Sequence, residues 1–532
     1  MGKKLLCLIT AIMMLASLCA CGGNNIAMDT SNKVDTANGG FVAETEKYVY
    51  FINGVENYTT AYKTGKVTKG ALMRTEKSNL ANLSSTTKYD TVVSKLIVSD
   101  DKDAGFYIYG DYVYYAVPST ENDKTGAVKN DQLNFFRTKL DASNTSKNIT
   151  GRDFSHSAKF RYVQSGNNVY LVVYSTDLYV YDANTGKELY TTELGKNGSS
   201  LDKVDVAEVV FAENNNGASV YFTSLPINKA LSDEENPTKD SYHVVYQVSL
   251  GANSVSANAK IVLDGIGTKT VGNDGENAEG VDTLGVTVDL LRYVDGTLYF
   301  SYTSLNTAVG TVAYMAIPEA DFAKADWKVR DWVKADYRLT LKDKNSASVF
   351  ADTSLILDKN TVLYTDATYG LLVYNYAKAS DADSDFGVSI AYTSDAVKGA
   401  TLAFVNKEGA DNFLYYYDSS KNFYKLNLTK VLAGEDVEEF RVNKLAIDTT
   451  WYLPEVVEVN GNYYMVAAYS DATYESYCYL INMTQLESEY NALETDEEKD
   501  EFYTVEEMDD DEFEEFLAAN ILGVREVVED EE

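Results

Sequence analysis

The sequence predicts an all-β protein folded as a single β-propeller, with eight blades expected and seven as the alternative. Tyr and Phe are abundant, at 42 and 20 residues, whereas Pro occurs only 5 times, so strand-forming aromatic residues far outnumber strand breakers. A pair made of an aliphatic residue and Tyr recurs along the chain at a nearly regular spacing. No linker rich in Pro or Ser interrupts residues 41–485, which favours one propeller over an array of small β-sandwich domains.

The N-terminus predicts export. Lys3 and Lys4 precede a short apolar segment that ends at Leu18, which is the pattern of a signal peptide over residues 1–20 and is too short for a transmembrane helix. Leu18-Cys19-Ala20-Cys21 resembles the lipobox of bacterial lipoproteins, although Cys19 stands where Ala, Ser or Thr is commoner. This resemblance implies that Cys21 is acylated and that the protein is anchored to membrane lipid on the extracytoplasmic face of the cell membrane. The alternative is an ordinary secretory signal cut near Ala20.

The polar residues 21–40 are expected to form a flexible tether between the lipid and the first folded element. Cys7 and Cys19 leave with the signal peptide and Cys21 carries the lipid, so Cys478 is left without a partner for a disulfide bond. Stability must therefore come from a large core.

The repeat occupies residues 41–485. From Tyr50 to Tyr464 it has seven intervals, so its mean period is about 59 residues. Gly, Asn or Asp precedes most copies, as hairpin turns require. The copies are Val49-Tyr50, Val113-Tyr114, Val169-Tyr170, Val220-Tyr221, Leu298-Tyr299, Leu363-Tyr364, Leu414-Tyr415 and the degenerate Tyr463-Tyr464.

Each copy has further strand-like segments beside it. An apolar run such as Val209-Val210-Phe211 precedes several copies, and a second aromatic run such as Leu178-Tyr179-Val180-Tyr181-Asp182 follows each one. Three recognisable strands and a weaker outer strand, repeated eight times, are typical of propeller blades. Because a propeller usually joins its first and last blades, Phe41-Val42-Ala43 is expected to complete the blade around Tyr464.

The repeat also resembles the tyrosine-rich β-propeller surface lipoproteins of Gram-positive bacteria, which are distantly similar to the YWTD propellers of the low-density-lipoprotein receptor. The residues that carry this resemblance are Tyr48-Val49-Tyr50-Phe51-Ile52-Asn53, Gly110-Asp111-Tyr112-Val113-Tyr114-Tyr115 and Leu178-Tyr179-Val180-Tyr181-Asp182. No YWTD tetrapeptide occurs in the chain. The resemblance implies the fold and a surface location, and it brings no activity, because the function of that family is largely unknown.

Residues 486–532 form an acidic tail, expected to be disordered or to contain a short helix near Phe513 and Phe516. This tail contributes much of the formal net charge of -35. So negative a chain is not expected to bind nucleic acid, which needs a cationic surface.

The sequence offers few residues for catalysis. His156 and His243 are its only histidines, and His243 lies in a strand-like segment where a packed side chain is favoured over a general base. Cys478 lies between Tyr477 and Tyr479 in a predicted strand, which indicates a buried and unreactive thiol. A zinc site is not expected, because His and Cys ligands are too few.

Asp381, Asp383 and Asp385 are the one weak candidate for a metal site, and the metal would be calcium. Gly387 comes one position too late for a calcium loop, and Tyr392 stands where the last carboxylate ligand belongs. A solvated acidic loop is therefore favoured, and no cofactor is expected.

The sequence thus predicts a lipid-anchored surface protein whose propeller is a non-catalytic binding or scaffolding module. Its ligand, an extracellular protein or glycan, is expected to bind loops on one propeller face, such as those near Asp233, Gly275 and Asp383. One alternative is a hydrolase of extracellular carbohydrate or cell wall that uses carboxylates on that face, although nothing singles out two among 81 acidic residues. The other is a purely structural component of the envelope.

Overall fold

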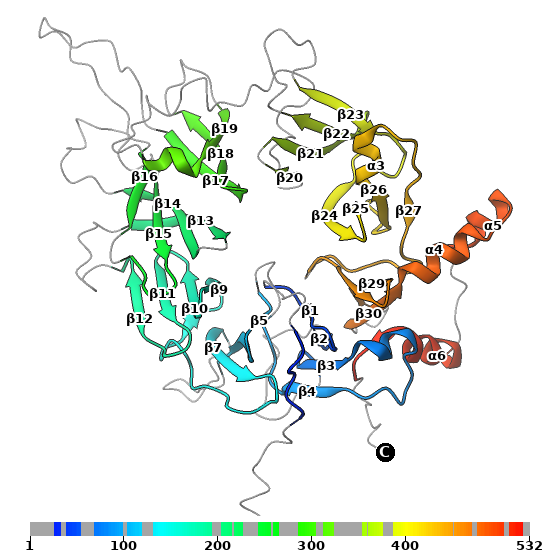
Figure 1. Cartoon of the computed structure of the whole chain (residues 1–532), viewed down its shortest axis with the longest axis horizontal. Coiled ribbons are helices and arrows are strands. Elements are labelled where there is room, and N and C mark those ends of the chain that lie inside the picture. The colour runs from blue at the N-terminus through cyan, green and yellow to red at the C-terminus, as the bar shows by residue number, and fades with distance from the viewer. Residues whose placement is uncertain are drawn as a thin grey trace, which may run out of the picture. The chain divides into compact units, whose positions relative to one another are not determined.

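The computed structural model is an eight-bladed β-propeller built from eight consecutive antiparallel sheets (Figure 1). It describes residues 26–32, 39–54, 69–98, 104–119, 131–193, 204–214, 217–226, 243–256, 259–264, 286–304, 312–323, 354–358, 360–375, 387–450, 452–470, 476–504 and 510–524. Each sheet is called a blade and numbered in chain order, and its strands follow one another as an up-and-down meander. The prediction of an all-β propeller with eight blades is confirmed.

The first two strands of every blade form a hairpin. The first strands are β1 (Val42–Glu44), β5 (Phe106–Tyr109), β9 (Lys159–Ser165), β13 (Val204–Asn214), β17 (Val286–Val294), β20 (Leu355–Asp358), β24 (Thr401–Glu408) and β28 (Glu455–Val459). The second strands are β2 (Tyr48–Ile52), β6 (Tyr112–Pro118), β10 (Asn168–Tyr174), β14 (Gly217–Pro226), β18 (Thr297–Ser304), β21 (Thr361–Asp366), β25 (Asp411–Tyr417) and β29 (Asn462–Ser470). All eight aliphatic–Tyr pairs, including the degenerate copy, lie in these second strands.

The outer two strands complete each blade. The third strands are β3 (Leu72–Glu76), β7 (Gln132–Lys139), β11 (Leu178–Asp182), β15 (Val244–Leu250), β19 (Val312–Pro318), β22 (Gly370–Asn375), β26 (Phe423–Asn427) and β30 (Ser476–Asn482). The fourth strands are β4 (Asp90–Val93), β8 (Phe154–Ser155), β12 (Glu188–Thr191), β16 (Lys260–Asp264), β23 (Val388–Tyr392), β27 (Phe440–Arg441) and β31 (Ile521–Leu522). Blade 5 has three strands within the described part of the chain.

Turn chemistry fixes the hairpins. In blades 5 and 8 both central residues of the turn have positive φ, at 47° and 74° for Asp295 and Gly296 and at 53° and 81° for Asn460 and Gly461. Such turns match the twist of the two strands that they join. The second strands then enter the core as nearly continuous apolar runs, and all five residues of β2 are buried.

The blades belong to two compact units. Blades 1, 2 and 8 form the first unit with the helix α6 (Asp510–Asn520), and blades 3–7 form the second with α3 (Leu428–Ala433), α4 (Met483–Asn491) and α5 (Asp496–Glu501). The chain leaves the first unit after β30, adds α4 and α5 to the second, and returns with α6 and β31. None of the helices within the described residues is long and apolar enough to cross a membrane.

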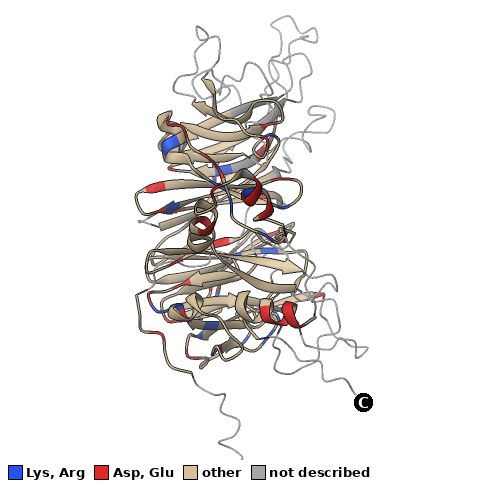
Figure 2. Cartoon of the chain, turned by 90° about the vertical axis from the view of Figure 1, so that its right-hand side faces the viewer, with Lys and Arg blue, Asp and Glu red and all other residues tan. Residues whose placement is uncertain are grey.

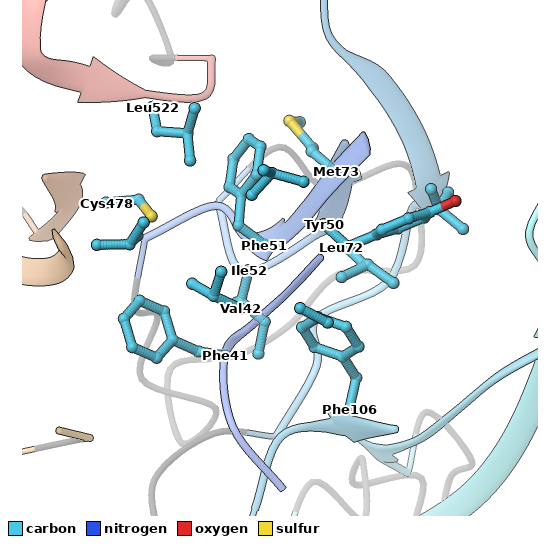
Figure 3. Packing of buried hydrophobic residues seen from close by; sticks show 14 of the residues in the cluster. Phe41, Val42, Tyr50, Phe51, Ile52, Leu72, Met73, Phe106, Cys478 and Leu522 are labelled. Carbon is cyan, nitrogen blue, oxygen red and sulfur yellow. The ribbon is translucent and has the colours of Figure 1, made fainter. Parts of the chain in front are cut away.

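One apolar cluster runs through blades 1, 2 and 8 (Figure 3). It includes Phe41 and Phe51 of blade 1, Phe106 of blade 2, and Cys478 and Leu522 of blade 8. Because Leu522 belongs to β31, the region predicted as an acidic tail contributes both a strand and a core residue to the last blade. The propeller therefore extends past the predicted end at residue 485.

The strand expected to join the first and last blades differs from the prediction. Residues 42–44 form β1 and pair with β2, for example Ala43 with Tyr50, so the prediction that Phe41-Val42-Ala43 completes the blade around Tyr464 is wrong. Blade 8 takes its fourth strand from β31 instead, with Cys478 paired to Leu522. The physical reason is that residues 42–44 immediately precede β2 and form a hairpin with it, whereas the edge of β30 is already paired with β31.

Side chains join blades 1 and 8. The Phe41 ring stacks on Tyr452 at a centroid distance of 3.7 Å, and the Phe41 backbone N–H donates to Glu455 Oε1 at 3.2 Å. The Asn53 side-chain amide binds both backbone groups of Val524, donating to its carbonyl at 2.8 Å and accepting from its N–H at 3.1 Å. The residues that follow β31 thus bind to blade 1 within this unit.

Residues 26–32 fall within the predicted flexible tether, but they pack against blade 1. Ile26 and Met28 lie against the core cluster, and Asp29 is buried, with Oδ2 accepting from the Tyr50 hydroxyl at 2.9 Å. The fully buried guanidinium of Arg74 donates to the Ala27 carbonyl, and its Nη2 lies 3.0 Å from Asp90 Oδ2. Within the described residues, the predicted tether is therefore part of the folded body from Ile26 to Asn32.

The Asn53–Val524 contact predicts a specific effect of replacing Gly523. Gly523 has φ +119°, and a Cβ there would overlap Asn53 Oδ1, so Gly523→Ala must strain the backbone and displace the amide. Gly461→Ala is the matched control, because Gly461 has φ +81° and open space around its Cβ position. We expect the control to lose about 1 kcal/mol of unfolding free energy, and Gly523→Ala to lose about 1–3 kcal/mol more. Denaturant unfolding measures both, and equal losses would contradict the role of the contact.

Candidate functional site

Several predicted site residues lie outside the described residues. These are the lipid-attachment residue Cys21, the calcium candidates Asp381, Asp383 and Asp385, and the loop residues Asp233 and Gly275. Within the described residues, no group of three or more His, Cys, Asp or Glu side chains is placed to hold a metal ion.

The strand order nevertheless fixes where the three predicted binding loops are attached. Residues 227–242 connect β14 to β15, and residues 265–285 connect β16 to β17. Both segments start at the end of the blade 4 strands that lies opposite the β13–β14 hairpin turn. Residues 376–386 connect β22 to β23 and start at the same end of the blade 6 strands as the β20–β21 hairpin turn. Successive connections of a meander alternate between the two ends of its strands, so the loop near Asp383 is attached at the opposite end from the loops near Asp233 and Gly275. The expectation that all three loops share one propeller face is therefore wrong.

Both histidines lie among the described residues. The Nδ1 atom of His243 lies 3.0 Å from the backbone N and 2.8 Å from the carbonyl O of Val288, so the side chain connects β17 to the residue before β15. His243 is partly exposed, and its ring nitrogen contacts the backbone of β17. His156 follows β8, and its backbone N–H donates to the Asp131 carbonyl at 2.9 Å.

Cys478 is a buried free thiol in β30, as predicted. Its burial, reinforced by the charge of Glu455, raises the pKa of the thiol far above its ordinary value. Since only the thiolate is a good nucleophile, this residue is unreactive at neutral pH.

A group of six rings with polar neighbours lies on blade 7 and the segments beside it. We call it the blade 7 aromatic band. It consists of the stacked pair Tyr416 and Tyr424 and of the mutually contacting rings Phe440, Tyr490, Phe502 and Tyr503. Arg441 connects the two sets, because it lies opposite Tyr424 in the sheet and over the ring of Tyr503. All of these elements belong to the second compact unit. Tyr424, Tyr490, Phe502 and Tyr503 are partly exposed, so this group offers ring faces to a ligand.

Strand register places the inner half of the band. Tyr416 of β25 lies directly opposite Tyr424 of β26, and their rings stack at 5.5 Å with an interplanar angle of 15°. β27 then places Arg441 opposite Tyr424. Aromatic pairs across neighbouring strands stabilise a sheet and fix the orientation of both rings.

The helix α4 and the residues that follow α5 contribute three of the other rings of the band. Tyr490 of α4 lies 5.5 Å from Phe440 and 5.6 Å from both Phe502 and Tyr503. A capping box at Thr495 and Glu498 starts α5 just before these last two rings. The Tyr503 hydroxyl donates to the Arg441 carbonyl at 2.9 Å, which ties the end of this segment to β27.

A buried ion pair holds α4 against blade 7. Lys425 Nζ lies 2.7 Å from Glu408 Oε2 and 3.5 Å from Glu487 Oε2 of α4, and the Tyr415 hydroxyl donates to Glu408. Lys425 and Glu408 are 8% and 3% exposed, so removal of Lys425 would leave the Glu408 carboxylate buried without a cation. Met483, also fully buried, begins α4 beside Tyr415.

Cations cover some of the rings. Arg441 lies over Tyr503 at 4.8 Å and Lys444 over Phe502 at 4.0 Å, which is within the range of cation–π attraction. The band therefore combines ring faces with donors that already have defined positions.

A carboxylate completes the band. Glu439 accepts from the Tyr416 hydroxyl and from Ser394 Oγ, the latter at 2.7 Å. Burial, and then the negative charge of Glu439, raise the pKa of Tyr416 far above its ordinary value. Burial likewise raises the pKa of Tyr503. Both hydroxyls therefore stay protonated and donate hydrogen bonds at neutral pH, which suits binding and not proton abstraction.

The sequence interpretation missed this band because half of it lies in the segment taken as an acidic tail. Tyr490, Phe502 and Tyr503 lie among many carboxylates, so the average composition of residues 486–532 is strongly acidic and does not indicate an aromatic cluster. The available signal was the grouping of aromatic residues within a charged segment, since a solubilising tail has few of them.

Comparisons with known proteins assign no family to this chain. No protein-family model matches the chain, and no curated protein matches it. BamB from Moraxella catarrhalis is 10% identical, with 85% of this chain and 98% of that chain covered and a TM-score of 0.34. The Dos1 propeller is 8% identical, with 83% and 91% covered and a TM-score of 0.38. A chain of the mitotic checkpoint complex is 8% identical, with 70% and 83% covered and a TM-score of 0.31.

Identities and TM-scores this low carry no inference about activity or partners. The eight sheets themselves define the class, which is an eight-bladed β-propeller protein.

Proposed function

We propose that this protein is a non-catalytic binding module of the cell surface and that it is anchored through lipid on Cys21. Its blade 7 aromatic band binds an extracellular glycan. The observation that supports a binding site there is the row of partly exposed rings whose positions are fixed by stacking, by Arg441 and by the bond from Tyr503.

The chemistry of the band suits a sugar chain. The C–H faces of a pyranose ring pack on flat aromatic surfaces, while its hydroxyl groups exchange hydrogen bonds with nearby polar groups. Tyr424, Phe502 and Tyr503 provide ring faces, and Glu439 and Arg441 provide an acceptor and a donor. The formal net charge of -35 disfavours a polyanionic ligand, so we expect a neutral glycan.

A lipid on Cys21 would hold the propeller close to the membrane. The folded body begins at Ile26 against blade 1, so only residues 22–25 separate Cys21 from it. A chain of this length spans at most about 18 Å. Two acyl chains anchor a protein stably, whereas one chain alone gives marginal binding.

Replacing Cys21 tests the anchor. Cys21→Ser removes the thiol that would carry the lipid, so we expect loss of membrane association, with the protein either released or left unprocessed. Cys478→Ser is a control that changes a buried thiol and leaves the N-terminus intact. Fractionation of cells into membrane and soluble parts measures the outcome. Normal processing and membrane retention of Cys21→Ser would contradict lipid attachment.

Glycan retention tests the binding site. We expect the purified protein to bind at least one neutral glycan among cell-wall fragments and an oligosaccharide panel, without producing new reducing ends. Phe502→Ala and Tyr424→Ala should each weaken binding by about 5–10-fold, because each removes a partly exposed ring worth about 1 kcal/mol or more. Tyr369→Ala is the control, since this residue is a partly exposed tyrosine of blade 6 outside the band.

Equal weakening by the control, or no retention of any glycan, would contradict the proposed site. Sustained release of reducing ends that is abolished by replacing one or two carboxylates would show that the protein is a hydrolase.

A further inference from the structure

A second row of aromatic rings lies on blade 8 and α6, in the other compact unit. We call it the blade 8 aromatic row, and it consists of Phe513, Phe516, Tyr479, Tyr469 and Tyr477. Successive ring centroids lie 6.3, 5.9, 5.9 and 6.4 Å apart in this order. Tyr479 is buried, and the other four rings are partly exposed.

Helical periodicity explains the end of the row on α6. Phe513, Phe516 and Leu517 fall on one side of the helix at spacings of three and four residues. Leu517 is 3% exposed and attaches this side to blade 8, where Phe516 contacts Tyr479. The two Phe rings stack with an interplanar angle of 16° and remain partly exposed, so the apolar side of α6 is wider than its contact with the blade.

Carboxylates flank this apolar side. At 100° per residue, Glu512 lies beside Phe516 and Glu514 lies beside Leu517, whereas Asp511 and Glu515 point to the opposite side of the helix. All four are exposed. Asp510–Asn520 contains five acidic residues and no Lys or Arg, and Figure 2 shows red acidic positions gathered along the short helices.

We propose that α6 and the blade 8 aromatic row form a docking surface for a Lys- and Arg-rich segment of a partner protein. Guanidinium and ammonium groups bind ring faces, and the same cations pair with carboxylates at the rim. The chain already makes such contacts in its other unit, where Arg441 and Lys444 lie over Tyr503 and Phe502.

Charge distinguishes this occupant from others. A second copy of the chain would bring an equally acidic helix against α6, and like charges in such a contact are unfavourable. Anionic lipid surfaces are repelled for the same reason. A neutral glycan could stack on the rings and donate hydrogen bonds to the carboxylates, but it would bring no positive charge to offset the five acidic residues of α6. This inference is independent of the proposed glycan site, which uses other residues in the other unit.

Peptide binding tests the proposal. The probe is a fluorescent synthetic peptide that alternates Arg with Ala, and a peptide that alternates Glu with Ala is its negative control. We expect the Arg peptide to bind the full chain in anisotropy titrations, more weakly as salt increases, and the Glu peptide not to bind.

Matched variants of α6 locate the binding surface. Glu512→Gln with Glu514→Gln removes the two carboxylates beside the rings and should weaken binding of the Arg peptide by about 3–10-fold. Asp511→Asn with Glu515→Gln makes the same charge change on the opposite side and should alter binding by less than about 2-fold. Phe513→Leu, which keeps an apolar side chain, should weaken it by about 2–5-fold through loss of one ring face.

Thermal unfolding checks that each variant is folded. Equal weakening by the two double variants would show nonspecific attraction to a negative protein and overturn the proposal. Full binding by Phe513→Leu, or no binding of the Arg peptide to the parent chain, would overturn it as well.

Discussion

The hydrogen bond from a buried tyrosine hydroxyl to a carboxylate is the interaction on which much of this structure depends. The chain has 81 acidic residues and only 46 Lys and Arg, so many carboxylates need donors other than cations. Tyrosines of the second strands supply them, as when Tyr50 donates to Asp29 at 2.9 Å and Tyr221 to Glu319 at 2.7 Å. Tyrosine suits this task because its ring fills the core while its hydroxyl reaches the rim of the blade.

The same bonds join segments far apart in the sequence. Tyr415 donates to Glu408, whose partner Lys425 also contacts Glu487 of α4, so a buried charge in blade 7 positions the C-terminal helices. Those helices carry half of the blade 7 aromatic band. Blade 8 gains β31 and α6 from the same acidic region, and with α6 it gains the end of its own aromatic row. The C-terminal region thus builds both surfaces that we interpret as binding sites.

The sequence predicted the repeated parts of the fold and missed the long-range ones. Alternating turns and aliphatic–Tyr pairs such as Val113-Tyr114 located all second strands, because local periodicity is enough to specify a buried hairpin. β31 has only two residues in a strongly acidic context, and only its pairing with Cys478 and Tyr479 makes it a strand. Residues 26–32 lacked any local signal too, since their order comes from Tyr50 and Arg74.

An alkaline titration tests this account most directly, by following tyrosinate absorbance and unfolding free energy together. Burial, and then the hydrogen bond to Glu319, raise the pKa of Tyr221 far above its ordinary value, and burial alone raises the pKa of Tyr115 to about 12. A raised pKa means that the fold favours the neutral hydroxyl, so its contribution is complete below about pH 10 and is lost as the pH rises through the folded-state value. Tyr115 alone should contribute about 2–3 kcal/mol. The account predicts that a large class of tyrosines ionises only above about pH 11, together with unfolding; ionisation of all tyrosines near pH 10 in a protein that stays folded would contradict it.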